Sequence, residues 1–297
     1  MFDFRYHVAS LAAVFFALVI GILVGVALAS HGLGNTERDR LQEDIRRAES
    51  RGDAFKAQVD ALTQSGASDR AFVERAYKLV MANRLKGKKI AILFVGSTDG
   101  NLSSVKTALS DADAGEPIRV RALTVPIDPT KLQRRLANRP FLAAFSGPKQ
   151  LEQLGHALGQ EFAGGGETPL LNALQSLIVE EKAGRLKKRA DGVVVVRTTS
   201  PQTGATAVFL KGLYAGLNDI GVPAVGVEGT DDPASAMKAF QKAGLSTVDD
   251  VDTRAGRLAL AALLSDSMTR GDFGVKPTAH DGPLPSVSPV VTTTTGG

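Results

Sequence analysis

The apolar stretch from Val8 to Ser30, VASLAAVFFALVIGILVGVALAS, constrains the fold of this chain more than any other segment. It carries no charged side chain. As a helix it would be about 34 Å long at roughly 1.5 Å per residue, enough to cross a bilayer core of about 30 Å. It therefore predicts a transmembrane anchor.

Two alternatives to a permanent anchor agree less well with the sequence. Ala27-Leu28-Ala29 resembles a signal-peptide cleavage site, but the apolar run is longer than the usual signal core of about 7 to 15 residues. A buried core helix is disfavoured because both faces of the stretch are apolar, which leaves no polar side. The sequence favours an anchor that is retained.

Small residues recur within this stretch at steps of four, which places them on one helix face. They are Ala9, Ala13, Ala17, Gly21, Gly25 and Ala29. Such a stripe lets two helix backbones approach closely, so it predicts self-association in the membrane.

Charge around the anchor bears on its orientation. Arg38, Arg40, Arg46 and Arg47 follow the stretch, whereas only Arg5 precedes it. By the positive-inside count, this asymmetry places the body of the protein in the cytoplasm.

Residues 1–35 are expected to hold a short N-terminal tail, the anchor and the short segment that leaves the membrane. Residues 36–86 then predict a helical spacer. Apolar or small residues recur in it at alternating steps of four and three, which is typical of a coiled-coil seam. The seam consists of Leu41, Ile45, Ala48, Phe55, Val59 and Leu62, with Gly52 between them. Together with the adjoining stripe it favours a homodimer, while a single amphipathic helix lying on the globular domain stays open. Residues 64–68, QSGAS, predict a break in this helix.

From residue 87 the sequence alternates between apolar runs and helical patterns. The runs at 89–95 and 192–196 are typical of buried strands, and helices are expected near 102–109, 148–162, 169–188, 203–218, 233–242 and 254–268. This alternation predicts an α/β domain over 87–276 with a Rossmann-like, largely parallel sheet and two candidate halves, 87–163 and 190–270. The tail, 277–297, is rich in Pro, Ser and Thr and predicts disorder.

Three polar loops follow predicted strands and should gather at the carboxyl edge of the sheet, where such folds bind ligands. They supply the candidate ligand-binding residues Ser97, Thr98, Asp99, Thr198, Thr199, Glu228 and Asp231. The alternative is that side chains such as Asp99, Thr203 and Asp232 only cap helices and turns.

The sequence offers little for catalysis or metal binding. It contains no Walker A, G-x-G-x-x-G or G-x-S-x-G motif, and no histidine lies near a candidate nucleophile, so we expect no enzymatic activity and no cofactor. The chain has no cysteine, and its four methionines and four histidines are scattered, so no local metal site is expected. The net charge of +4 is not clustered, which argues against nucleic-acid binding.

The opening residues FDFRYHVASLAAVFFAL, the Gly21-x-x-x-Gly25 that follows, the coiled coil and the α/β body together resemble the bacterial MctB family, named for a proposed copper transport protein. The resemblance implies a non-enzymatic, single-pass envelope protein with a body outside the cytoplasm and a role in copper efflux or homeostasis. It also implies the alternative role of a membrane-anchored scaffold or regulator of cell-wall hydrolysis and cell separation, with an envelope protein as partner. We follow the resemblance on topology, because long domains translocate regardless of flanking charge.

Overall fold

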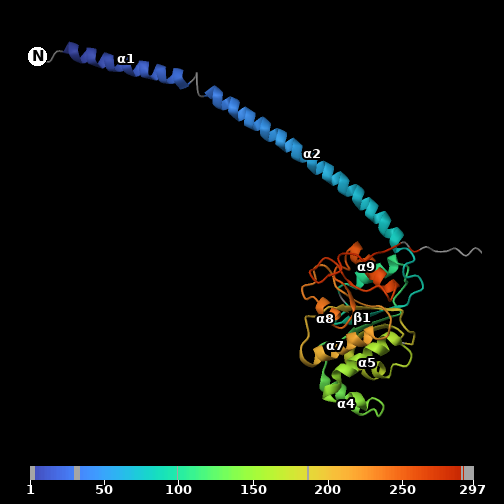
Figure 1. The fold of residues 1–297 in the computed structure, drawn as a ribbon. Helices are drawn as coiled ribbons and strands as arrows, with labels where there is room; N and C mark the ends of the chain where they lie inside the picture. The colour runs from blue at the N-terminus through green and yellow to red at the C-terminus, as the bar shows by residue number, and fades with distance from the viewer. Residues whose placement is uncertain (1–3, 30–33, 99, 186, 289, 291–297) are drawn as a thin grey trace, which may run out of the picture. The chain divides into compact units, whose positions relative to one another are not determined.

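The computed structural model describes residues 4–29, 34–98, 100–185, 187–288 and 290. The chain forms two compact units, the first ending at Phe72 and the second beginning at Val73. The first unit holds helix α1, Phe4–Leu28, and most of helix α2, Gly34–Met81 (Figure 1). Within the described residues, His7–Leu28 is the one stretch long and apolar enough to cross a membrane. This agrees with the predicted anchor in length and composition.

Helix α2 runs through residues 64–68 without interruption, so the predicted break there is wrong. Gly66 sits in the helix with nothing within 4 Å of the position of a Cβ. One glycine costs a helix interior only about 1 kcal/mol, which is too little to end a helix of this length.

The end of α2 belongs to the α/β unit and not to the spacer predicted over 36–86. Met81 and Leu85 are completely buried in its core. The Tyr77 hydroxyl donates a hydrogen bond of 2.6 Å to the Asp111 carboxylate. Burial, reinforced by this contact, raises the pKa of Tyr77 to about 12.

The second unit is built on one seven-stranded sheet with the order β3-β2-β1-β4-β5-β6-β7. All neighbouring strands are parallel except β3, which runs antiparallel to β2. The strands are β1 Ile90–Val95, β2 Arg119–Leu123, β3 Val179–Gly184, β4 Gly192–Arg197, β5 Ala224–Val227, β6 Ser246–Val248 and β7 Asp272–Phe273. The two candidate halves therefore share a single sheet.

Helices cover both faces of this sheet, as the fold class predicted (Figure 1). One face carries α3, Leu102–Asp111, α9, Arg254–Ser265, and the end of α2. The other carries α4 Pro129–Ala137, α5 Leu151–Gly164, α6 Pro169–Ile178, α7 Gly204–Asn218 and α8 Met237–Lys242, with short 3-10 turns at Ala143–Phe145 and Pro148–Gln150. Strand residues alternate between the faces: Leu93 and Val195 pack on one, Phe94 and Val196 on the other.

Strand β3 replaces the second half of the helix expected over 169–188. Helix α6 ends at Ile178, and five of the next six residues pair with β2. Their sequence, VEEKAG, has no strong strand pattern. The free edge of β2 supplies the backbone partners that make this segment a strand.

Helices α5 and α7 cross through two pairs of glycines. Gly155 and Gly159 of α5 face Gly212 and Gly216 of α7. A Cβ at Gly155 would lie 2.9 Å from the backbone nitrogen of Leu213, closer than the 3.0 Å that real Cβ atoms essentially never cross. The two backbones are therefore in direct contact.

The segment after residue 276 differs from the predicted disorder in its first part. Gln241 donates a hydrogen bond to the Thr278 carbonyl at 2.9 Å, and Arg84 donates one to the Ser288 carbonyl at 2.7 Å. Val287 packs against the core. Residues 277–288 are thus held on the body by contacts that a Pro-rich composition does not reveal, and residues 291–297 lie outside the described part.

Candidate functional site

The predicted ligand loops do meet at one edge of the sheet. Strands β1, β4 and β5 are adjacent and parallel, so the loops that follow them leave from the same edge. Helix α3 follows β1 on one face of the sheet and α7 follows β4 on the other, so the chain diverges between these two strands. In doubly wound sheets this is the position at which ligands bind.

Side chains fill the space between the loops after β1 and β4. The Thr198 hydroxyl donates to the Ser97 carbonyl at 3.1 Å, and the Thr199 hydroxyl donates to the Val95 carbonyl at 3.4 Å. Both threonines close over Gly96, where a Cβ would lie 2.5 Å from Thr198 Oγ1. The structure therefore brings Ser97, Thr198 and Thr199 together, but their polar groups bind the chain itself. Of the other predicted residues in the first loop, Thr98 has contacts of its own and Asp99 lies outside the described residues.

The loop after β5 is organised by Asp232. Its carboxylate accepts hydrogen bonds from the Gly229 backbone N–H at 2.7 Å and from the Asn101 side-chain amide at 2.9 Å. Asp232 thus stabilises its own turn and connects this turn to the loop after β1. This agrees with the alternative that Asp232 caps a turn. Asp231 is exposed.

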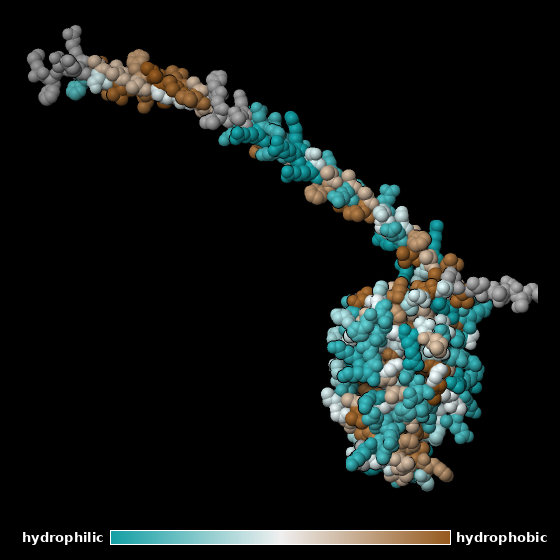
Figure 2. Space-filling model, viewed as in Figure 1, coloured by the Kyte–Doolittle hydropathy of each residue, from teal (hydrophilic) through white to brown (hydrophobic). Residues whose placement is uncertain are grey.

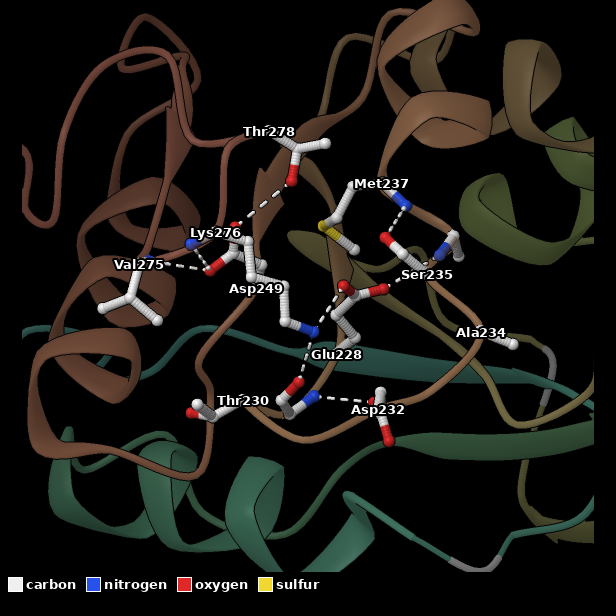
Figure 3. Close-up of polar contacts among 12 residues, drawn as sticks. Glu228, Thr230, Asp232, Ala234, Ser235, Met237, Asp249, Val275, Lys276 and Thr278 are labelled. Carbon is white, nitrogen blue, oxygen red and sulfur yellow. Dashed lines mark hydrogen bonds and ion pairs between the residues drawn. The ribbon is translucent and has the colours of Figure 1, made fainter.

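Glu228, at the end of β5, is 2% exposed and forms an ion pair with Lys276 at 2.8 Å (Figure 3). Its second oxygen accepts a hydrogen bond from the Ala236 N–H at 2.8 Å, and the Lys276 ammonium also donates to the Gly229 carbonyl at 2.7 Å. A buried charge with this many partners holds the β5–α8 loop against the segment after β7. Sequence reasoning named Glu228 but missed Lys276, for which no local motif gives a signal.

Asp249 and Asp250 follow β6, and both are buried. Asp249 accepts hydrogen bonds from the backbone N–H groups of Val275 and Lys276, at 2.8 and 3.2 Å. Asp250 accepts one from the Thr253 hydroxyl at 2.9 Å. Burial, reinforced by the neighbouring carboxylates, raises the pKa of Asp250. This cluster fixes the loop that leads into α9.

The predicted packing residues of α1 and α2 are exposed in the single chain. The stripe Ala9, Ala13, Ala17, Gly21, Gly25 and Ala29 lies on α1 or at its end, and a Cβ at Gly21 or Gly25 would have nothing within 4 Å. The seam Leu41, Ile45, Ala48, Phe55, Val59 and Leu62 lies on α2, with no side chain covering it among the described residues. Figure 2 shows the apolar surface of α1 and the more polar surface of α2.

Candidate copper ligands do not converge in the described part of the chain. No group of three His, Cys, Asp or Glu side chains there has the geometry to hold a metal ion. Met81 and Met237 are buried in the core, and Met268 is exposed. His156 contacts the Asp219 carboxylate at 2.7 Å, and His31 lies outside the described residues. Within the described ranges, the side chains do not fit a copper site built within one chain.

These features define a class of protein in which an α/β domain follows a long helix and one apolar helix that fits a single-pass membrane anchor. The family model described as "Copper transport outer membrane protein, MctB" matches residues 1–283, nearly the whole chain. The chain belongs to the MctB family, as its opening residues predicted. No curated protein matches it. At the level of the family, it is a copper-transport-related protein of the cell envelope.

Proposed function

We propose that two copies of this protein associate along α1 and α2, and that each displays an α/β body that binds an envelope partner without catalysing a reaction. One observation carries this proposal, the apolar seam along α2. Leu41, Phe55 and Leu62 are 64%, 67% and 67% exposed. A regular row of exposed large apolar side chains marks an interaction surface.

The residue types in the seam favour a second copy of the chain as the occupant. Ile45 and Val59 stand at one set of core positions, and Leu41 and Leu62 stand at the other. β-Branched residues at the first set and leucine at the second favour parallel two-stranded coiled coils. The stripe on α1 precedes the seam in the chain and supplies a close-packing surface of its own.

Disulfide trapping tests this dimer, because the chain has no cysteine of its own. In membranes, Leu62→Cys should form an intermolecular disulfide on oxidation. Asp60→Cys, outside the seam on the same helix, is the matched control and should stay monomeric. Gly21→Leu combined with Gly25→Leu should lower the yield if the α1 stripe contributes. Equal trapping at positions 60 and 62 would contradict the seam.

Charge reversal tests whether the helices are parallel and in register. In that arrangement Arg51 lies opposite the partner's Lys56, and the two like charges repel. Lys56→Glu turns the repulsion into attraction and should raise the trapping yield of Leu62→Cys. Arg46→Glu reverses a charge outside these flanking positions and should not. An unchanged or lower yield with Lys56→Glu would contradict the parallel register.

Within the copper-related role of the family, we propose that this chain acts indirectly and neither carries nor conducts the metal. The chemistry of its donors supports this, because copper(I) prefers cysteine and methionine sulfur, and the described methionines lie apart. Calorimetry of the full-length protein with copper(I) and copper(II) should show no binding tighter than about micromolar. Tighter, stoichiometric binding would overturn the indirect role.

A second candidate function is a scaffold or regulator of cell-wall hydrolysis and cell separation. The part of α2 that precedes the α/β unit, residues 34–72, favours it, because these 39 residues span about 58 Å at roughly 1.5 Å per residue. Such a spacer can hold a binding domain away from a membrane. Both roles require an extracytoplasmic body. Protease should then digest the body in intact cells with a permeabilised outer envelope, and digestion only after lysis would refute both.

A further inference from the structure

A cavity of about 240 Å³ opens between helices α7 and α8, on the face of the sheet opposite α9. Leu210 and the alanines 207, 239 and 243 give it an apolar lining. For scale, an engineered apolar cavity of about 150 Å³ holds a benzene molecule. The cavity is therefore large enough for a small organic molecule. It adjoins the loop cluster described above through Arg197 and Gln202.

Two polar side chains line this cavity with groups that the described part of the chain leaves unpaired. Tyr214 is 3% exposed, and its hydroxyl has no hydrogen-bond partner among the described residues. The same is true of Nε of Arg197, at the end of β4. Buried polar groups without partners are rare and costly in folded proteins, so a bound hydrogen-bond acceptor would stabilise both of these groups.

Both side chains are held in place by other contacts. The Tyr214 ring packs edge-on against Phe240, with ring centroids 5.0 Å apart. Arg197 donates hydrogen bonds through Nη2 to the carbonyls of Ala234 and Ser235, at 3.1 and 2.7 Å, while its buried Nε has no partner among the described residues. Burial raises the pKa of Tyr214, while the charge of Arg197 acts in the opposite direction. The phenol thus stays protonated at neutral pH and can donate.

The unpaired groups and the charge around the cavity favour an anion. A guanidinium N–H can only donate, and a protonated phenol donates readily, so together they suit a ligand oxygen that accepts. Lys242 and Lys211 also line the cavity, and Lys211 is paired with Glu152 at 2.9 Å. The charges of Arg197 and Lys242 remain in excess.

We propose that this cavity binds a small organic anion with an apolar body, whose carboxylate accepts hydrogen bonds from Arg197 Nε and Tyr214 Oη. The apolar body would lie against Leu210 and the alanines of α7 and α8. This site goes beyond the proposed function and does not depend on dimerisation or on copper.

The probe for the test is 2-naphthoate, titrated calorimetrically into the full-length protein in lipid nanodiscs, with empty nanodiscs as the reference. We expect saturable binding of one molecule per chain with a Kd below about 1 mM, and weaker binding of the uncharged 2-naphthamide. Tyr214→Phe keeps the ring and removes only the hydroxyl, so it should weaken binding about three- to tenfold.

Charge reversal at the cavity provides a second test that leaves the core intact. Lys242→Glu should weaken binding of 2-naphthoate, whereas Lys238→Glu, on the same helix but away from the cavity, should not. The proposal is overturned if no saturable binding is seen. It is also overturned if the acid and the amide bind equally, or if Tyr214→Phe and Lys242→Glu both leave the affinity unchanged.

Discussion

Replacing Gly212 by alanine should destabilise the α/β body, because α5 and α7 are in backbone contact at this glycine. A Cβ at Gly212 would lie 2.8 Å from the carbonyl carbon of Glu152, and the carbonyl oxygen is nearer still. Ordinary contact begins at 3.4 Å, so the two helices would have to separate by at least about 0.6 Å. No flexible side chain is available to absorb the shift.

The expected cost follows from two opposing effects. Overpacking a close contact costs about 1–3 kcal/mol, and contact between two backbones belongs at the upper end of that range. Alanine is a better helix former than glycine, which stabilises the variant by up to about 1 kcal/mol. The net loss is about 2 kcal/mol of unfolding free energy. For a domain of this size it lowers the Tm by about 4–8 °C.

The assay is thermal unfolding of the full-length protein in detergent, followed by near-ultraviolet circular dichroism. Gly164→Ala is the matched control, because it lies on α5 and its Cβ would meet only Ile220 Cδ1, at an ordinary 3.6 Å. Its Tm should stay within about 2 °C of the parent protein. The double variant Gly155→Ala, Gly212→Ala should lose less than the sum of the single losses, because the first substitution already separates the helices. A Tm for Gly212→Ala equal to that of Gly164→Ala would refute the backbone contact.

Three further predictions concern charge and helix continuity. Lys276→Met should cost about 3–5 kcal/mol in urea unfolding, because it leaves the buried Glu228 carboxylate unpaired, and adding Glu228→Gln should recover much of that loss. Asp250→Asn should raise the Tm at pH 7, since Asn can still accept the Thr253 hydrogen bond. Because the folded-state pKa of Asp250 is raised, the charged carboxylate destabilises the folded protein, and this destabilisation disappears as the pH falls and Asp250 takes up a proton. The higher Tm of the variant should therefore be lost near pH 4. A Tm difference that grows on acidification would contradict the sign of the pKa shift. Gly66→Ala should stabilise helix α2 by up to about 1 kcal/mol, measured by thermal unfolding followed by far-ultraviolet circular dichroism. A loss of helix stability would argue for a break at that position.

The local sequence pattern was enough to predict those elements in which consecutive apolar residues indicate burial. The runs IAILFV and GVVVVR are short and apolar at nearly every position, which is typical of a strand covered on both faces. The anchor could be predicted for a similar reason, since its length and lack of charge suit a bilayer. The family could be predicted because its most specific residues lie in the first thirty.

Elements that depend on a distant partner could not be predicted in this way. The segment VEEKAG becomes β3 because β2 offers a free edge, and nothing in its composition indicates this. The glycines of α5 and α7 look like helix-weakening residues until the two helices are brought together. Pattern within one segment cannot show which other segment will pack against it.

The candidate site also combines features that local pattern predicts with contacts that it does not. The parallel alternation of strands and helices correctly placed Ser97, Thr198 and Glu228 at one edge of the sheet. It did not show that Thr198 would bond to the Ser97 carbonyl or that Glu228 would pair with Lys276, 48 residues away. The Tyr214 hydroxyl and the Arg197 Nε, which have no partner among the described residues, were missed altogether, because an unsatisfied polar group has no signature in sequence.

By itself, the sequence determined that this protein has an apolar helix of membrane-spanning length, a long helix with a row of exposed apolar side chains and an α/β body of the MctB family. These properties depend on periodicity and composition within single segments, because the pattern of apolar residues determines which face of each segment is buried. The tertiary structure alone decided which polar groups of the described residues are satisfied inside the chain and which are not. Hydrogen bonds and ion pairs depend on distances of a few ångströms between residues far apart in the chain, and only folding sets those distances.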